Sequence, residues 1–137
     1  MTGRAIVSLA LVTAASMVAQ GFGRFTYPVL LDAINADVLD SYGRAGLLGT
    51  VSLVAYLVGT AVVALVSTRL EPISLVRVGL VLSTIGIGLL TIASGFVSLA
   101  VALAIAGLGG AGVWVPAPGI AAAAVGPARA GLAIGLV

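Results

Sequence analysis

Residues 96–125 read FVSLAVALAIAGLGGAGVWVPAPGIAAAAV, a run without a single charged side chain. A helix of about 20 apolar residues crosses the roughly 30 Å of hydrocarbon in a bilayer, so this run is long enough to span a membrane. Residues 45–68 are also uncharged, and residues 73–94 carry a charge only at Arg77, near their start. Residues 5–34 form a fourth apolar run, with Arg24 deep inside it and Asp32 near its end. These runs predict an all-α polytopic membrane protein, a bundle of membrane-spanning helices.

The composition favours the same class. Of the 137 residues, 61% are hydrophobic and 7% are charged, and the mean hydropathy is +1.32. Such a chain has too little polar surface to cover a soluble domain. The isoelectric point near 9.7 comes from six arginines that are scattered singly, whereas nucleic-acid-binding domains gather theirs into a patch. The sequence therefore indicates a lipid bilayer as the surroundings and argues against nucleic acid as a partner.

The chain contains no cysteine and no histidine. Their absence removes disulfides, thiolate nucleophiles, the usual zinc ligands and any histidine-based catalytic triad. Serines such as Ser52 and Ser83 have no histidine base, and no paired carboxylates or metal-binding cluster can be recognised. We therefore expect neither an enzyme nor a cofactor nor a metal site.

The arginines predict which side of the membrane each loop faces. Short loops rich in arginine stay in the cytoplasm during insertion, whereas acidic residues count for little. With the N-terminus inside, four arginines are cytoplasmic, namely Arg4, Arg69, Arg77 and Arg129, and one, Arg44, is external. The loop at residues 35–43 is then external. We expect a multi-pass protein of the cell membrane with a cytoplasmic N-terminus.

Each end of the sequence admits two interpretations. At the start, Arg4 followed by residues 5–15 has the form of a signal peptide, but apolar residues continue through Leu31, which favours a first span that stays attached. At the other end, a fifth span begins near Ala130 and stops at Val137, after about a third of the length that a span requires. This pattern predicts a truncated chain. The alternative is a complete small protein whose last residues lie at the membrane interface.

Small residues recur four positions apart in several of these runs, which places them on one face of a helix. Four such pairs are Gly79 and Ser83, Gly107 and Ala111, Ala106 and Gly110, and Gly131 and Gly135. Membrane helices associate through close approach at small residues, so we interpret these pairs as packing surfaces. Residues 107–112 also match the dinucleotide pattern GxGxxG, but they lie inside an apolar span with no preceding strand, and we reject that site.

The first and fourth spans share a weak internal repeat. Gly21 and Pro28 are seven positions apart in one span, and Gly109 and Pro116 are seven positions apart in the other. Aromatic residues precede both prolines, namely Phe25 and Tyr27 in the first span and Trp114 in the fourth. Proline removes a backbone donor and kinks a helix, and the freed carbonyl is tolerated beside a watery cavity. Interrupted helices at matching positions of two repeats indicate the binding site of a transporter.

Three segments carry a resemblance to a known family. They read QGFGRFTYP at residues 20–28, SYGRAGLLGT at residues 41–50 and GPARAGLAIG at residues 126–135. They resemble the YbfB/YjiJ group of the major facilitator superfamily of transporters. The resemblance implies a twelve-helix fold of two six-helix halves, each built from two inverted three-helix repeats. Residues 1–137 would then be the N-terminal part of the first half, with its first four helices and the start of the fifth.

Two regions depart from the pattern of that superfamily. The loop between the second and third helices usually carries an Asp, a Gly and several basic residues, whereas this chain has Thr68 and Glu71 there, and only Arg69 fits well. In the fourth helix, Leu103 stands where proton-coupled drug exporters carry an arginine. These departures argue against proton-coupled drug efflux and leave proton coupling with another solute open.

Arg24 is the charged residue that lies deepest inside an expected span. A buried arginine is costly, so it usually faces a cavity, pairs with another group or extends to the surface. Gln20 lies one turn earlier on the same face, and no carboxylate lies mid-membrane beside it, so we expect Arg24 to bind an anionic solute. The candidate substrate-binding residues are Arg24, Gln20, Tyr27 and Trp114. The alternative for Arg24 is an interfacial anchor among the lipid headgroups.

These features together predict transport of a small organic solute by alternating access, a mechanism with no covalent chemistry. The alternative is a small integral membrane protein that transports nothing and forms an oligomeric bundle through its glycine-lined faces. The expected partners are the lipid bilayer and the small-molecule substrate.

Overall fold

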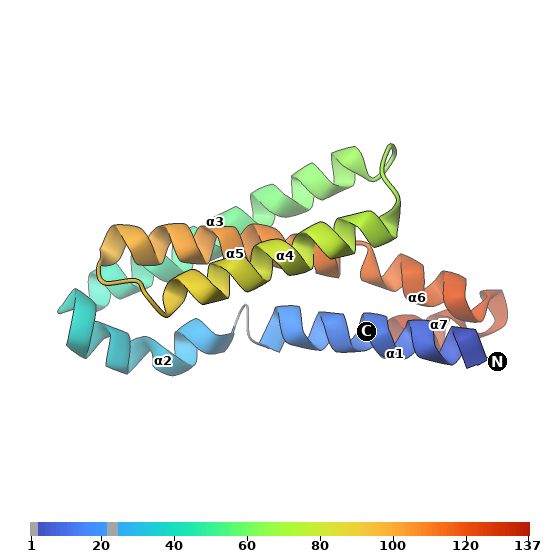
Figure 1. The fold of residues 1–137 in the computed structure, drawn as a ribbon, viewed down its shortest axis with the longest axis horizontal. Coiled ribbons are helices and arrows are strands. Elements are labelled where there is room, and N and C mark those ends of the chain that lie inside the picture. The colour runs from blue at the N-terminus through green and yellow to red at the C-terminus, as the bar shows by residue number, and fades with distance from the viewer. Residues whose placement is uncertain (1–2, 22–24) are drawn as a thin grey trace.

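The computed structural model describes residues 3–21 and 25–137, which contain helices and turns but no strand (Figure 1). The helices are α1 (Gly3–Gln20), α2 (Thr26–Ile34), α3 (Tyr42–Val66), α4 (Pro72–Leu90), α5 (Phe96–Trp114), α6 (Ala117–Val125) and α7 (Ala130–Gly135), with a π-helical turn η2 (Asn35–Leu39) and a 3₁₀ turn η3 (Pro127–Arg129). Within these described residues, three stretches are long and apolar enough to cross a membrane, namely Tyr42–Val66, Pro72–Leu90 and Phe96–Val125. The predicted all-α fold of membrane-length helices is confirmed.

The first expected span, residues 5–34, is divided between two α-helices in the described part of the chain. α1 ends at Gln20 and α2 begins at Thr26, and residues 22–24 between them lie outside the described residues. The division falls before Pro28, which is the third residue of α2. In the first turn of a helix the backbone N–H groups have no intrahelical partner, so a proline there costs no hydrogen bond.

The fourth expected span bends in its second half. α5 ends at Trp114 and α6 begins at Ala117, so the bend coincides with residues 115–116. Pro116 and Pro118 have no N–H, which deprives two carbonyls of the preceding turn of their usual donors. Beyond the bend, α6 leaves the line of α5 and packs beside α1 (Figure 1).

Local chemistry accounts for several of the helix boundaries. Pro72 opens α4, at a position where its fixed φ suits a helix. At the start of α5, the hydroxyl of Ser98 accepts a hydrogen bond of 3.1 Å from the N–H of Gly95. Gly126 ends α6 with a φ of 79°, in the region that favours glycine. Asp40 ends η2 with a φ of 50°, which short polar side chains also tolerate.

α5 is the central helix of the bundle and packs most extensively against α4. A Cβ atom added to Gly79 of α4 would lie 2.7 Å from the carbonyl oxygen of Gly109, and one added to Gly86 would lie 2.5 Å from the backbone nitrogen of Ala106. Both distances are shorter than real Cβ contacts. The prediction that Gly79 and Ser83 form a packing face is therefore confirmed, since a Cβ on Gly109 would meet the backbone nitrogen of Ser83.

The interface between α5 and α3 is also built on close approach. A Cβ on Gly107 would lie 2.6 Å from the carbonyl oxygen of Ser52, and one on Gly59 would lie 2.9 Å from the Cβ of Ala111. The predicted packing role of Gly107 and Ala111 is confirmed. In α7, by contrast, added Cβ atoms on the predicted pair would meet no atom within 4 Å in the described part of the chain, as the values for Gly131 and Gly135 show.

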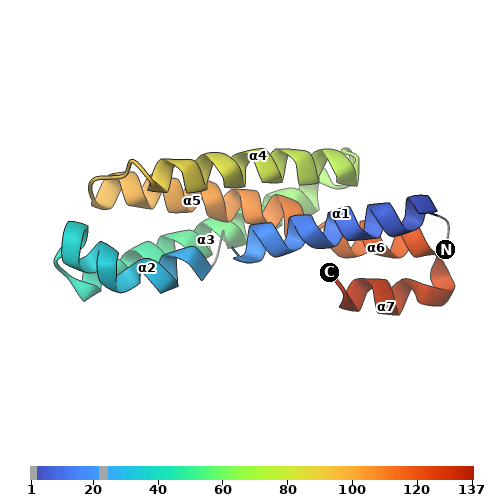
Figure 2. The ribbon, with the colours of Figure 1, turned by 60° about the horizontal axis from the view of Figure 1, so that its bottom comes forward.

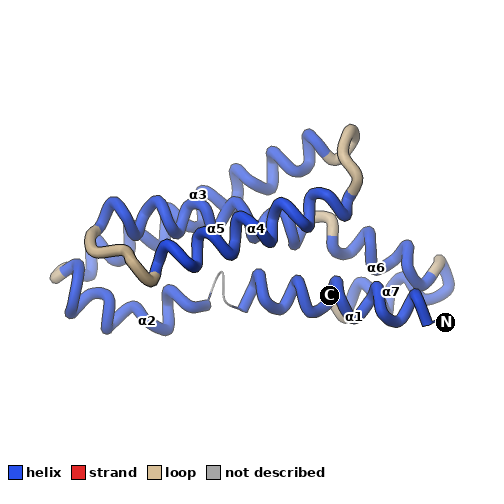
Figure 3. The backbone as a smooth tube through the Cα atoms, in the orientation of Figure 1, coloured by secondary structure: helices blue, strands red, loops and turns tan. Residues whose placement is uncertain are grey.

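The connecting turns gather at two opposite ends of the bundle. The turn after η2 and the turn between α4 and α5 lie at one end, whereas the start of α1, the turn between α3 and α4 and the turn between α6 and α7 lie at the other (Figure 3). α7 then folds back beside α6 (Figure 2). The loops expected to be cytoplasmic thus share one end of the molecule.

Candidate functional site

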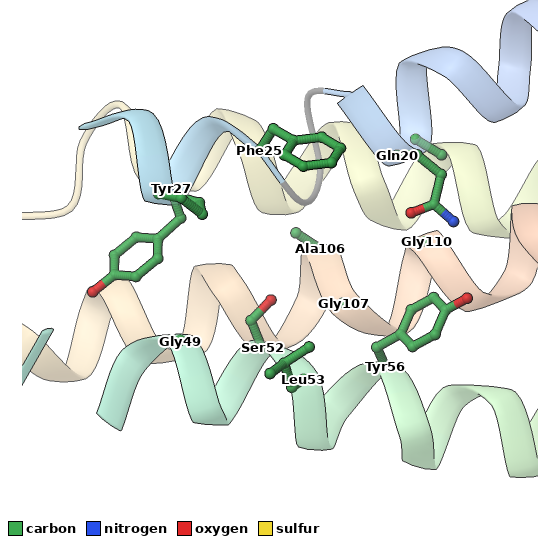
Figure 4. Close-up of a pocket in the computed structure, with 12 residues that line it drawn as sticks. Gln20, Phe25, Tyr27, Gly49, Ser52, Leu53, Tyr56, Ala106, Gly107 and Gly110 are labelled. Carbon is green, nitrogen blue, oxygen red and sulfur yellow. The ribbon is translucent and has the colours of Figure 1, made fainter. Parts of the chain in front are cut away.

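A cavity of about 480 Å³ lies where the division of the first span faces α3 and α5 (Figure 4). The residues that line it are Ala19, Gln20, Phe25, Tyr27, Pro28, Gly49, Ser52, Leu53, Tyr56, Ala106, Gly107 and Gly110. Ser52 and Tyr56 are near the middle of the 25-residue helix α3, so the cavity is at about half the height of the bundle. Its volume falls within the range of small-molecule sites, about 300–1,000 Å³.

Polar side chains enter the cavity from two walls. Gln20, the last residue of α1, extends its amide into the space above α5 (Figure 4). Ser52 and Tyr56 project from α3 on the opposite side, and their hydroxyls face the same space (Figure 4). A primary amide both donates and accepts hydrogen bonds, and so does a hydroxyl. The two walls together offer a solute several hydrogen-bonding groups at the middle of an apolar bundle.

Tyr27 forms one end of the cavity. Its hydroxyl donates a hydrogen bond of 2.6 Å to the carbonyl oxygen of Ala45 on α3, and only 6% of the residue is exposed. The hydroxyl is thus used within the protein, and the ring shapes the cavity. Tyr27 also lines a second, mostly apolar cavity of about 310 Å³, which extends between α2 and α4 towards the loop end of η2. Its ring therefore stands between the two cavities.

The four residues predicted from the sequence to bind substrate do not all share this place. Gln20 and Tyr27 line the cavity. Arg24 lies outside the described residues. Trp114 is at the C-terminal end of α5, one turn beyond Gly110, and is 38% exposed. It is not among the residues that line the cavity. The structure thus brings two of the four together.

Ser52 and Tyr56 line the cavity and were missed as binding residues by the sequence analysis. A signal was present, because they are four positions apart in an otherwise apolar span and so share one helix face. Gly49, three positions before Ser52, lies on that face as well and also lines the cavity. Hydroxyl side chains are common in membrane helices, however, and Thr60 one turn later simply bonds to its own helix, donating to the carbonyl oxygen of Tyr56 at 2.9 Å.

The described wall of the cavity consists of neutral residues only. Nor do the aspartate and glutamate side chains within residues 3–21 and 25–137 form a group of three that would hold a metal ion. The wall contains one amide, the hydroxyls of α3, and the rings of Phe25, Tyr27 and Tyr56. Such a wall binds a small molecule by hydrogen bonds and by contact with aromatic faces.

Membrane-length helices around a cavity at half height define a polytopic membrane protein. The family model of the Major Facilitator Superfamily matches residues 10–137, and the chain belongs to this family. Its members are transporters rather than enzymes. No curated protein and no solved structure gives a significant match to the chain. The predicted superfamily is confirmed, and membership of the YbfB/YjiJ group within it stays a prediction.

Proposed function

We propose that the protein is a secondary transporter that moves a small organic solute across the cell membrane by alternating access. The observation that carries this proposal is the cavity bounded by α1 and α2 of the first span and by α5, the helix that bends into α6 at residues 115–116. Transporters place their substrate site near the bilayer midplane, beside discontinuous helices of corresponding repeats. Gln20, Ser52 and Tyr56 supply the hydrogen-bonding groups of this site, and Tyr27 bounds it.

The proposed solute is an anion, held by Arg24. This step rests on the sequence, in which Arg24 is four residues after Gln20 and four before Pro28. A guanidinium binds a carboxylate or phosphate through two parallel hydrogen bonds, a geometry that lysine does not reproduce. Because every described lining residue of the cavity is neutral, Arg24 would supply the charge that selects the anion. Trp114 is proposed to contact the solute elsewhere along its path.

The proposed orientation has the N-terminus in the cytoplasm. Two features support it: the arginine bias of the loops, and the common end of the bundle shared by the start of α1, the α3–α4 turn and the α6–α7 turn (Figure 3). The segments quoted above support placement in the YbfB/YjiJ group. Proton coupling to anion movement is compatible with this assignment.

Transport in proteoliposomes tests the proposal. The probes are radiolabelled monocarboxylates and sugar phosphates, with the matching neutral amides and sugars as comparisons. We expect uptake of an anion that Arg24→Ala lowers by a factor of about 30 or more, because truncating one partner of a hydrogen-bonded charge pair costs at least about 2 kcal/mol. Arg24→Lys should retain part of the uptake.

The matched control is Arg44→Ala, which also removes one arginine, but at an exposed position in the first turn of α3. Its uptake should equal that of the unmodified protein. Normal anion uptake by Arg24→Ala would instead make Arg24 an interfacial anchor. Uptake confined to the neutral probes would support the proposed transport function and would contradict the proposal that the solute is an anion.

A further inference from the structure

Three glycines line the central cavity, and they differ in what surrounds them. A Cβ on Gly107 would lie 2.6 Å from the carbonyl oxygen of Ser52, so close packing against α3 already requires a glycine there. The corresponding atom on Gly49 would lie 3.8 Å from Cε1 of Tyr27, and the one on Gly110 would lie 3.8 Å from Cδ2 of Tyr56. These are ordinary van der Waals contacts. Helix packing would therefore accept alanine at Gly49 and at Gly110.

Both of these glycines are inside helices, where alanine is the more stable residue. Neither adopts the left-handed backbone that only glycine favours, because the positive-φ glycine of the described chain is Gly126. Neither close approach of helices nor backbone conformation therefore requires glycine at Gly49 and Gly110, although glycine is less stable than alanine there.

What the two positions share is the cavity. Gly49 faces the ring of Tyr27 at one end of it, and Gly110 faces the ring of Tyr56 near the other end (Figure 4). A methyl group at either position would fill space beside the ring that a solute would contact. We propose that Gly49 and Gly110 are specificity-determining positions, whose lack of a side chain sets the width of the cavity and so the largest solute it admits.

This inference rests on the proposed function for the identity of the occupant, but the width of the cavity can be measured without any transport. One methyl group in a snug apolar pocket discriminates between ligands by a factor of about 10–200. We therefore expect an alanine at either position to slow the entry of a bulky molecule about 10-fold or more, while a molecule of the size of a methyl group enters as before.

Cysteine labelling provides the measurement, because the chain has no cysteine of its own. Ser52→Cys introduces a thiol of similar size in the wall of the cavity, on the helix that also carries Gly49. The protein is labelled in detergent, so that reagents reach it from both sides. The probes are two methanethiosulfonates, one carrying a methyl group and one carrying a biphenyl group.

In the Ser52→Cys background, Gly49→Ala and Gly110→Ala should each slow the biphenyl reagent about 10-fold or more and leave the methyl reagent unchanged. The matched control is Gly46→Ala, one turn before Gly49 on α3. An added Cβ there meets no atom within 4 Å, and Gly46 lines neither the central cavity nor the cavity between α2 and α4. It should change neither rate.

An unchanged biphenyl rate in either variant would overturn the assignment of that glycine. Equal slowing of both reagents would overturn it for both glycines, because the variants would then have altered the fold or the reactivity of the thiol. Neither result depends on transport, so a failure of this proposal can be told apart from a failure of the proposed function.

Discussion

Replacement of Gly79 by alanine should weaken the bundle, and the size of the effect follows from the geometry of the α4–α5 interface. The added Cβ would lie 2.7 Å from the carbonyl oxygen of Gly109, 2.7 Å from the carbonyl carbon of Gly112 and 2.8 Å from the backbone nitrogen of Val113. All three are backbone atoms of α5, which no rotation of a side chain can move away. The two helices must therefore separate.

Carbon atoms in contact are about 3.5–4.0 Å apart, so the separation is roughly 1 Å, enough to forfeit a quarter to a half of the attraction between the facing atoms. Overpacking of this kind costs about 1–3 kcal/mol. Alanine in place of glycine inside a helix returns roughly 0.5–1 kcal/mol. The net loss is roughly 0–2.5 kcal/mol, and we expect Gly79→Ala to lower the free energy of unfolding by about 1 kcal/mol, the middle of that range.

The free energy of unfolding is measured by titrating the protein from mild detergent into dodecyl sulfate, with circular dichroism and the fluorescence of the single tryptophan, Trp114, as probes. The matched control is Gly88→Ala in the same helix, where an added Cβ meets no atom within 4 Å. It should be neutral or stabilising. If Gly79→Ala were within about 0.5 kcal/mol of Gly88→Ala, the range of ordinary surface substitutions, the close approach of α4 and α5 would be refuted.

Two further predictions concern the orientation of the protein in the membrane and the hydrogen bond of Tyr27. In intact cells, an impermeant thiol reagent should label the cysteine of Asp37→Cys and should not label that of Ser74→Cys, because the arginine bias places residues 35–43 outside. The reverse labelling pattern would contradict the orientation. Tyr27→Phe removes the hydrogen bond of 2.6 Å to the backbone of Ala45. In the same detergent titration, the free energy of unfolding should fall by about 0.6–1.5 kcal/mol. An unchanged free energy would mean that this hydrogen bond adds nothing to stability.

The fold class could be predicted because the bilayer acts on every residue of a span at once. A stretch such as residues 96–125 must keep its backbone groups bonded within itself and its side chains apolar, and both demands are visible in the sequence. A bend in the fourth span was expected from its prolines, and it is present at residues 115–116. Its consequence was not predictable from the sequence: the bend lets α6 pack against α1, a contact between segments about a hundred residues apart.

For the site, the sequence singled out Gln20 and Tyr27 by their polarity beside a proline, and it missed Ser52 and Tyr56 on α3. A hydroxyl inside a membrane helix bonds to its own backbone as readily as to a ligand, so composition alone does not distinguish the two uses. Only the packing of α3 against α5 and the divided first span shows which hydroxyls face a common space.

The sequence by itself determined that this chain is a bundle of membrane helices, because charge spacing and hydropathy are properties of each segment taken alone. It also marked small residues such as Gly79 and Gly107 as packing positions, since their spacing on one face needs no knowledge of the partner helix. Tertiary structure alone decided that Gly79 meets backbone atoms of α5 while Gly49 and Gly110 border a cavity. The physical reason is that the role of a glycine depends on the space beside its Cα atom. That space is either filled by a neighbouring helix or left empty as part of a cavity, and only the tertiary structure shows which.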